Sequence, residues 1–373
     1  MKNRIGIIGG GQLGRMLTLE AKKLGFHVTV IDPTPQGPAA QVADDQIIAA
    51  YSDPEATKKL ITQCDFVTLE VEHIDTKTLK DLKTSKMNPS AATVELIKDK
   101  YAQKVFLKKH FIATPEFEEI KEEKDIEIIA KKFGYPLVLK AKHDAFDGRG
   151  NAIIKTKKDI HNAYEILKSH ELYAEKFVDF HKELSVIIAR GESGELKTYP
   201  VVETIQKNNI CHMVIAPAQI DLKIIQKAEK NAKKVMKYLM GTGVFAIEMF
   251  LDNKNNILIN EIAPRVHNSG HFSIEACITS QFEQHIRAVT HLPLGSTDMI
   301  HPAAVMINIL GDRKGPVEVK GLEKVLKIPN VHVHIYGKAE TKPERKMGHI
   351  TVTGEKMNDV LRLAKRVRKM ISI

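Results

Sequence analysis

The sequence contains few cysteines and no long apolar run. Its three cysteines, Cys64, Cys211 and Cys277, lie far apart among 373 residues, which excludes a disulfide framework or a zinc knuckle. No stretch approaches the ~18 consecutive apolar residues needed to cross a bilayer, so a membrane span is excluded as well. The N-terminal residues run directly into an apolar segment and a glycine turn, without a signal-peptide pattern. We therefore expect a reduced, cytoplasmic protein.

Aromatic residues are also scarce, at 6% of the chain, whereas 43% of residues are hydrophobic and 27% charged. This balance is typical of a folded protein. The net charge of +10 attracts anions, but scattered lysines without interleaved aromatics do not predict a nucleic-acid surface. The densest basic stretch, residues 362–369, alternates with apolar residues at helical spacing, as in a core-facing helix with a solvated basic side. We predict no nucleic-acid partner and attribute the charge to small phosphorylated substrates.

Short apolar strands alternate with helical patterns near the N-terminus. Strands are expected at 5–8, 28–31 and 66–69, and helices at 12–24 and 54–62, an order that predicts a parallel sheet with right-handed crossovers. The pattern breaks near residues 86–90. Beyond it we expect antiparallel strands, a long helix at about 221–239, and a small module after residue 295. The predicted fold is α/β and α+β, with a Rossmann-like domain (1–88), a central domain (89–296) and a small β-rich domain (297–373).

The first glycine turn fits the pattern G-x-G-x-x-G through Gly9, Gly11 and Gly14. Glycines there allow the backbone to approach a phosphate, which the following helix N-terminus can hold. Asp32 ends the second strand 18 residues after Gly14, where a dinucleotide fold keeps its ribose-binding acid. An NAD-dependent oxidoreductase is one hypothesis, beside another phosphate-binding turn or a purely structural one. The stiff segment 33–38 argues against NAD, because its prolines direct the chain away from the usual ribose position.

Two glutamates lie on apolar strands that flank the turn-forming segment 252–256. If the hairpin is symmetric about Lys254 and Asn255, Glu248 and Glu261 lie opposite one another, with Cβ atoms ~4.5–5.5 Å apart. Such a pair is tolerated on a protected face if a cation lies between the carboxylates or one is protonated. Oxygen ligands favour magnesium shared with substrate phosphates. Two solvated edge glutamates are the alternative, but the apolar neighbours favour a metal site.

Lys140 ends another apolar strand, and the glycine-containing segment 146–150 follows six residues later. A lysine at a strand tip beside a flexible loop suits the binding of nucleoside phosphates, although many hairpins share this pattern. Glu175 and Glu183 form a further acidic pair, for which a surface role and a ribose or adenine contact are equal alternatives.

Several hydrogen-bond donors follow Glu261 within one glycine-containing turn. Arg265, His267, Asn268, Ser269 and His271 stand before an expected helix. They suit an anion, and a capped helix start at Asn268 or Ser269 is compatible with that role, because helix N-termini themselves bind anions.

The order of these motifs resembles the ATP-grasp superfamily. More narrowly, nearly the whole chain resembles the 5-(carboxyamino)imidazole ribonucleotide synthases of purine biosynthesis. The similarity is carried by segments 9–15, 147–150, 260–271 and 345–349, and the Asn-Ser-Gly-His sequence at 268–271 separates this branch from other ATP-grasp ligases. The resemblance implies a two-lobed central ATP-grasp domain and a homodimer. It also implies that ATP phosphorylates bicarbonate to carboxyphosphate, and that the exocyclic amine of 5-aminoimidazole ribonucleotide captures the carboxyl group, giving ADP and phosphate.

The resemblance further implies roles for individual residues. Lys140, Arg149 and Gly150 would contact the phosphates of ATP. Glu175 and Val178 would contact its adenine, and Glu183 its ribose. Glu248 and Glu261 would bind two magnesium (or manganese) ions. The implied ATP site comprises Lys100, Lys140, Asp147, Gly148, Arg149, Gly150, Glu175, Lys176, Phe177, Val178, Glu183, Gln206, Asn260 and Glu261. The implied ribonucleotide site comprises Gly10, Gly11, Gln12, Leu13, Glu70 (for the ribose), Lys338 and Arg345 (for the phosphate). The implied catalytic residues are Asp147 and Arg149 at the imidazole and Arg265, His267, Asn268 and Ser269 at the carboxyphosphate.

The chain also departs from the family pattern. Phe146 replaces a usual tyrosine, Asp144 and Ala145 replace a Gly-Gly pair, Lys100 replaces an arginine, and Gln206 replaces a histidine. Lys100 keeps the charge but loses the bidentate fork of arginine.

Three alternatives stay open at this point. A formate-dependent glycinamide ribonucleotide transformylase shares the architecture but is disfavoured by Gln12 and by segment 267–271. An NAD-dependent oxidoreductase and a non-catalytic nucleotide-binding regulator are disfavoured by the two magnesium glutamates, which neither would need.

Overall fold

The N-terminal domain is a parallel sheet with helices on its faces, in a computed structural model that describes residues 3–143 and 150–373. Its strands, β1 (Arg4–Ile8), β2 (His27–Ile31), β3 (Asp45–Ile47) and β4 (Phe66–Leu69), have the order β3-β2-β1-β4. All three pairings are parallel, as the alternation of strands and helices predicted. The helices are α1 (Gln12–Lys23), α2 (Pro54–Gln63) and α3 (Thr76–Asp81).

A small lobe follows the connecting helices α4 (Ala91–Lys98) and α5 (Lys100–Lys109). Its antiparallel sheet has the order β5-β8-β6-β7. The strands are β5 (Phe117–Ile120), β6 (Leu137–Ala141), β7 (Asn151–Ile154) and β8 (Leu172–Lys176), and the helices are α6 (Glu123–Phe133) and α7 (Ile160–Leu167). The apolar faces of both helices bury against the sheet around residues such as Ile129, Leu139 and Leu167. The small lobe thus has its own core.

The large lobe and the C-terminal module share one nine-stranded sheet. Its order is β14-β13-β9-β11-β12-β15-β19-β17, with β10 paired to β9. The junction is the antiparallel pairing of β12 with β15. The strands are β9 (Phe180–Arg190), β10 (Leu196–Thr198), β11 (Val202–Lys207), β12 (Ile210–Ala216), β13 (Gly243–Asp252), β14 (Ile257–Ala263), β15 (Ala303–Leu310), β17 (Val331–Ile335) and β19 (Lys346–Gly354). The three-domain fold is confirmed, and the sheet runs across the predicted boundary at residue 296, whose position stays a prediction.

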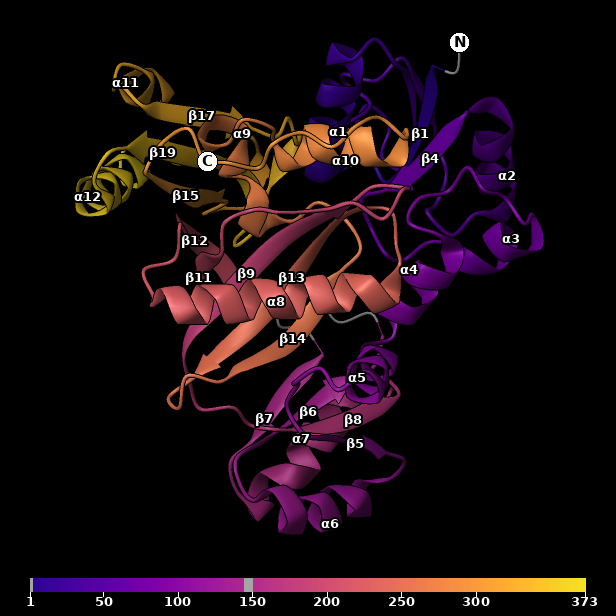
Figure 1. Cartoon of the computed structure of the whole chain (residues 1–373), viewed down its shortest axis with the longest axis vertical. Helices are drawn as coiled ribbons and strands as arrows, with labels where there is room; N and C mark the ends of the chain where they lie inside the picture. Colours follow the sequence, from indigo (N-terminus) through magenta and orange to yellow (C-terminus); the bar gives the residue numbers. More distant parts are fainter. Residues whose placement is uncertain (1–2, 144–149) are drawn as a thin grey trace.

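Helices cover both ends of this sheet (Figure 1). The long helix α8 (Leu222–Leu239) lies over β9, β13 and β14 and buries Val235 and Met236 there. At the other end α12 (Met357–Arg368) packs on β15 and β19 through Val360, Ala364 and Val367. Arg362, Lys365 and Arg366 lie on the solvent side, as the helical spacing predicted, whereas Arg368 is partly buried and donates to Asn308 O at 3.1 Å. The remaining elements are α9 (Ser273–Ala276), α10 (Gln281–Val289), α11 (Leu322–Leu326) and the short pair β16 (Gly315–Pro316) and β18 (Glu340–Thr341).

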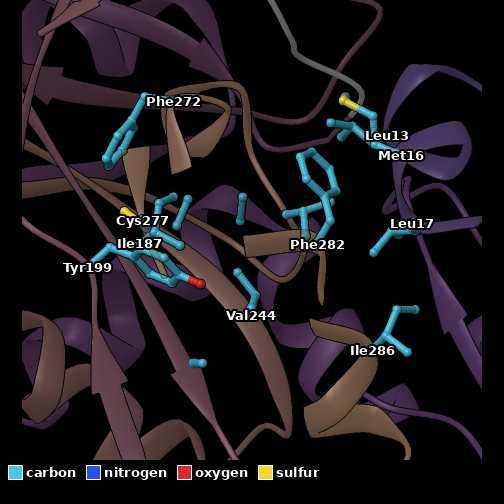
Figure 2. Packing of buried hydrophobic residues seen from close by; sticks show 14 of the residues in the cluster. Leu13, Met16, Leu17, Ile187, Tyr199, Val244, Phe272, Cys277, Phe282 and Ile286 are labelled. Carbon is cyan, nitrogen blue, oxygen red and sulfur yellow. The ribbon is translucent and has the colours of Figure 1, made fainter. Parts of the chain in front are cut away.

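One apolar core joins the N-terminal domain to the large lobe. Figure 2 shows Leu13 and Leu17 of α1 near Phe282 and Ile286 of α10, and these residues belong to one buried cluster with Tyr199. This contact fixes the glycine turn before α1 relative to the central domain. Within the described residues no helix is long and apolar enough to span a bilayer.

Candidate active site

A cleft of about 1090 Å³ lies where the two lobes, the N-terminal domain and β19 meet. It brings together most of the predicted site residues, although they come from distant parts of the sequence. The predicted residues that line it are Gln12, Leu13, Glu70, Lys100, Lys140, Glu175, Lys176, Phe177, Val178, Glu183, Gln206, Glu248, Asn260, Glu261, Arg265, His267 and Asn268. Gly10, Gly11, Gly150, Ser269, Lys338 and Arg345 are not among the lining residues. Phe146, Asp147, Gly148 and Arg149 lie outside the described residues.

The two glutamates of the β13–β14 hairpin face each other, as predicted. Glu248 pairs with Glu261, but the hairpin is not symmetric about Lys254 and Asn255. Near the turn the pairs are centred on Lys254, and a β-bulge at Asn260 then shifts the register by one residue. The bulge brings Glu261 opposite Glu248, because without it Glu248 would lie opposite Asn260. Bulges commonly redirect a side chain beside a functional site.

Lys100 distinguishes the two carboxylates. Its Nζ lies 2.8 Å from Oε2 of Glu261. Burial alone would raise the pKa of Glu261, but the Lys100 ammonium lowers it below the ordinary value. Burial, together with the carboxylates of Glu261 and Glu183, raises the pKa of Glu248 to about 7. The carboxylate of Glu261 therefore has a cation beside it, whereas the carboxylate of Glu248 is not balanced by a nearby cation to the same degree.

This arrangement fits a divalent cation shared with substrate phosphates. The described residues contain no group of three or more histidine, cysteine, aspartate or glutamate side chains placed to hold a metal by themselves. Magnesium typically takes one or two protein carboxylates and completes its octahedral shell with water and phosphate oxygens. The facing carboxylates of Glu248 and Glu261 supply that donor set, and the raised pKa of Glu248 marks where a cation would relieve the repulsion.

A buried ion cluster lies between α5 and strands β6 and β8 of the small lobe. Lys140 Nζ is 2.9 Å from Oε1 of Glu175, and Lys104 Nζ is 2.9 Å from Oε2. Although burial opposes it, the two ammonium groups lower the pKa of Glu175. Burial lowers the pKa of Lys104 to about 8, with Lys140 acting in the same direction and Glu175 opposing. Lys104 was not predicted from the sequence, although it lies on α5 one helical turn after Lys100.

Glu183 lies on β9 beside the predicted nucleotide position. Burial raises its pKa to about 7, while a hydrogen bond from Gln206 acts in the opposite direction. Nearby, Phe180 and Phe250 stack with ring centroids 4.6 Å apart. Strands β9 and β13 therefore present a carboxylate of raised pKa and two aromatic rings at one end of the cleft. Such a pairing suits a hydroxyl-bearing sugar and a planar base.

The glycine turn before α1 holds a carboxylate of the protein itself. Glu70 accepts hydrogen bonds from the backbone N–H groups of Gly11 and Gly14, although burial raises its pKa. The amides that we expected to face a phosphate are thus engaged. The end of β4 places Glu70 there, and the predicted ribonucleotide contacts of Gly10 and Gly11 stay predictions.

The carboxylate of Asp32 is engaged by hydrogen bonds within the protein. Its buried carboxylate accepts hydrogen bonds from Gly10 N–H at 2.8 Å, Thr34 N–H at 2.8 Å and Tyr51 O–H at 3.0 Å. The chain after β2 folds back over the turn, where Ala39 N–H donates to Gly10 O at 2.9 Å. The proline-rich segment thus covers the position that an adenosine ribose would need, which argues against a dinucleotide site.

The turn after β14 is held by a dense set of hydrogen bonds. His267 Nδ1 lies 2.9 Å from Ser269 Oγ, which lies 2.8 Å from Ser185 Oγ. His267 Nε2 lies 3.4 Å from Glu248. Burial, with the charge of Arg265, lowers the pKa of His267 well below its ordinary value, so the ring is neutral.

Arg265 itself is fixed by an acid of the N-terminal domain. Its Nε lies 2.9 Å from Oε1 of Glu72, and both side chains are one-fifth exposed. The pairing spans two domains and directs the cationic side chain toward the cleft. Glu72 is a further residue that the sequence did not single out.

The predicted phosphate clamp lies on the loop between β17 and β19. Burial, with the charge of Arg345, lowers the pKa of Lys338 to about 8, and Glu70 is among the charges that act on this lysine. Lys338 Nζ donates to Lys346 O at 2.7 Å, and Arg345 donates to Glu340 O at 2.7 Å. Lys346 lines the cleft, and it was not predicted from the sequence although it stands next to Arg345. Three cations, Lys338, Arg345 and Lys346, therefore lie on this loop and at the start of β19, and Lys346 is the one that lines the cleft.

Models of three protein families match consecutive parts of the chain. A ribonucleotide synthetase preATP-grasp domain matches residues 1–98, an ATP-grasp domain residues 105–282, and a phosphoribosylaminoimidazole carboxylase C-terminal domain residues 304–363. The three matches follow the order of the observed domains.

Relatives and solved structures agree with these models. The N5-carboxyaminoimidazole ribonucleotide synthase of Staphylococcus haemolyticus is 40% identical over 93% of this chain and 92% of its own length. The phosphoribosylaminoimidazole carboxylase of Candida albicans is 44% identical over 95% of this chain but 64% of its own length, so the chain spans about two thirds of this longer fungal relative.

The Thermotoga maritima N5-carboxyaminoimidazole ribonucleotide synthetase is 48% identical, with a TM-score of 0.91 and 99% of each chain covered. The Aspergillus clavatus synthase, solved with ADP and 5-aminoimidazole ribonucleotide, is 38% identical, with a TM-score of 0.92 and 99% of each chain covered. The family resemblance read from the motifs is thereby confirmed. This chain belongs to the N5-carboxyaminoimidazole ribonucleotide synthase family of ATP-grasp proteins.

Proposed function

We propose that this protein is an ATP-grasp ligase that carboxylates 5-aminoimidazole ribonucleotide in purine biosynthesis. The observation that carries the proposal is the convergence, in one cleft, of facing carboxylates, several lysines and a neutral donor-rich turn. Reactions that join phosphates, bicarbonate and a ribonucleotide must hold several anions together. Cations and N–H donors therefore matter more here than a covalent nucleophile.

The expected reaction has two steps. An oxygen of bicarbonate attacks the γ-phosphorus of ATP, so that ADP leaves and carboxyphosphate forms. The exocyclic amine nitrogen of the ribonucleotide then forms a bond to the carboxyl carbon, phosphate departs and the amine loses a proton. No cysteine is needed, and all three cysteines are buried and lie outside any nucleophile motif.

The residues divide this work by position. Lys140 and Lys100 would neutralise nucleotide phosphates on the small-lobe side, and Glu183 would bind the ribose. Lys338 and Arg345 would hold the ribonucleotide phosphate. Magnesium ions held by Glu248, Glu261 and the phosphates would neutralise charge as the phosphoryl group moves.

The turn that contains His267, Asn268 and Ser269 would surround the acyl phosphate. Its donors are preorganised by hydrogen bonds within the turn and to Ser185, so little reorganisation is needed when charge develops. Arg265 would add a cation, although its present partner is Glu72. The homodimer, the cytoplasmic location and the roles of the segment 147–149 stay predictions from the resemblance.

The direct test is ADP release from Mg-ATP and bicarbonate, with and without 5-aminoimidazole ribonucleotide. Release that requires both the imidazole and bicarbonate would support the proposal. A parallel mixture of glycinamide ribonucleotide, formate and Mg-ATP serves as the control. Release only in that mixture would assign the chain to the transformylase reaction, and no release in any mixture would refute ligase activity on either substrate.

A further inference from the structure

A row of buried polar side chains crosses the C-terminal part of the large sheet. In the strand register Asn308 of β15 lies opposite His349 of β19, and His349 lies opposite His334 of β17. Residues paired across antiparallel strands project to the same face of a sheet. Asn308 and His349 are fully buried. Three adjacent strands therefore present an amide and two imidazoles side by side, where an apolar row would be usual.

Each member of this row contacts a different point of the segment after β14. Asn308 and Asn268 exchange two amide hydrogen bonds, of 3.0 and 2.7 Å. The ring of His349 lies against that of His271, with centroids 4.8 Å apart, and stacks on His334 at 4.4 Å. His334 Nε2 lies 2.6 Å from Glu275 on α9. The row thus holds the segment 268–275 at three successive places.

Further hydrogen bonds hold the members of this row in place. Tyr336 Oη lies 2.8 Å from Nδ1 of His349, and Asn308 Nδ2 also donates to Cys211 O at 2.7 Å. On the side of the turn, Gln281 donates to His267 O at 2.7 Å and lies 3.2 Å from His271 Nδ1. A buried polar network with several partners specifies one arrangement of its members, because each displaced group would lose a hydrogen bond in a dry environment.

The histidines do not form an acid–base or metal site. Burial, with the charge of His334, lowers the pKa of His271 to about 3. Burial and the two neighbouring histidines lower the pKa of His349 well below its ordinary value. The buried, neutral rings of His271 and His349 therefore act through packing and hydrogen bonding rather than through proton transfer. No metal-type cluster of three ligands occurs in the described part of the chain.

We propose that Asn308, His349 and Tyr336 are positioning residues, which hold the turn 268–271 at the acyl-phosphate side of the cleft. The proposal rests on the proposed function for the identity of the bound group. The β17–β19 hairpin carries two members of this row, His334 and His349, and, at its end, the cations Lys338 and Lys346. The C-terminal sheet therefore sets the spacing between the acyl-phosphate turn and the ribonucleotide clamp.

The test uses substitutions that remove single contacts in the full-length protein. Tyr336→Phe deletes only the hydroxyl that holds His349. His349→Asn keeps a polar group near the Nδ1 position, whereas His349→Leu removes it. The matched control is Thr351→Val, on the same strand and face of β19. Thr351 is fully buried, and its hydroxyl has no hydrogen-bond partner among the described residues, so the exchange removes no contact to the turn.

The first measurement is hydrogen–deuterium exchange of peptides covering residues 265–276, which needs no substrate. We expect faster exchange in Tyr336→Phe and His349→Leu than in the wild type, and wild-type exchange in Thr351→Val. Unchanged exchange in the first two variants would overturn the proposal. If His349→Leu fails to fold, Tyr336→Phe alone decides.

The second measurement separates kcat from KM. A misplaced turn should lower kcat about 10-fold in Tyr336→Phe, since small misplacements of catalytic groups can cost up to ~100-fold, and KM for the ribonucleotide should change less than about 2-fold. More ADP should form per product, because water intercepts carboxyphosphate, and His349→Asn should retain more activity than His349→Leu. Faster exchange with unchanged kcat would refute a catalytic role for the row. A wild type without imidazole-dependent ADP release would refute the proposed function, while the exchange data would still decide whether the row holds the turn.

Discussion

The buried cluster of Lys104, Glu175 and Lys140 allows a quantitative prediction about charge balance. Two ammonium groups share one carboxylate, with both ion pairs at 2.9 Å. The side chains of Lys104 and Glu175 are only 2% and 3% exposed. We predict that Glu175→Gln is far more destabilising than Lys104→Met. The reason is that the first change leaves two buried cations without an anion, whereas the second leaves a one-to-one pair.

The expected loss in unfolding free energy depends on which buried charges each variant leaves unpaired. Removing one partner of a buried ion pair costs about 3–5 kcal/mol when the other charge stays buried and unpaired. Glu175→Gln meets that condition. In Lys104→Met, Glu175 keeps Lys140, and the loss is limited to the lysine's remaining contacts, such as its 3.0 Å hydrogen bond to Thr114, about 1–2 kcal/mol. For a chain of 373 residues, an unfolding entropy of about 0.8 kcal/mol/K converts these costs to about 4–6 °C and 1–3 °C in Tm.

The pH dependence supplies an independent check with a defined sign. The pKa of Lys104 is about 8 in the folded protein, against about 10.4 for an unfolded chain. Its protonated form is therefore disfavoured by folding. This cost is full below the folded pKa, declines as pH rises through it, and vanishes only above the unfolded pKa. Without Glu175 the pKa of Lys104 should fall further. The deficit of Glu175→Gln should thus be largest near pH 6 and smaller near pH 9.

Scanning calorimetry of both single variants and of the double variant at pH 6 and pH 9 measures these effects. The double variant should be more stable than Glu175→Gln, because it removes one of the two uncompensated cations. The far-ultraviolet circular dichroism spectrum of each variant serves as the control for a folded chain. The reasoning would be refuted if Lys104→Met cost as much as Glu175→Gln, or if adding it to Glu175→Gln lowered Tm further.

The other predictions concern the metal, the ribonucleotide and the glycine turn. Glu261→Gln should reduce turnover at least about 100-fold with little change in Tm, because it removes one of two facing carboxylates; normal ADP release would contradict the metal site. A chelator should stop ADP release and added magnesium should restore it, whereas activity without divalent cations would show that the glutamates serve another purpose. Arg345→Ala should raise KM for the ribonucleotide about 10-fold, equal to about 1.4 kcal/mol, with kcat nearly unchanged; unaltered saturation would place the phosphate elsewhere. Asp32→Ala should cost about 1–3 kcal/mol, because it leaves the Gly10 amide without its partner, and wild-type protein should show no saturable NAD binding.

Features set by neighbouring residues were predictable from the sequence. The parallel N-terminal sheet and the helix at 222–239 follow from periodicity, and both are observed. The opposition of Glu248 and Glu261 was also predicted, but from a symmetric hairpin that does not exist. The sequence of β14 would look the same with or without a bulge at Asn260. The register beside the site therefore depends on packing, which the pattern of apolar and polar residues does not reveal.

Contacts between distant segments were not predictable in the same way. Lys104 joins Glu175 across 71 positions, and Asn268 joins Asn308 across 40. A lysine on an amphipathic helix usually lies in solvent, and only the tertiary fold shows that this one is buried. Lys346 was missed for a different reason. It stands beside the predicted Arg345, and the basic loop alone does not show which of its cations lines the cleft.

The glycine turn shows how a single distant residue changes the meaning of a local motif. Gly9, Gly11 and Gly14 create the backbone geometry that a dinucleotide pyrophosphate would use. In this fold the end of β4 places the Glu70 carboxylate against the amides of Gly11 and Gly14. The partial positive charge of the helix N-terminus is thus used within the protein, and it stabilises a buried acid at the position proposed for the ribose. A phosphate group is then better accommodated by the cations of the β17–β19 loop. In the proposed ribonucleotide site, different domains would therefore recognise the phosphate and the sugar.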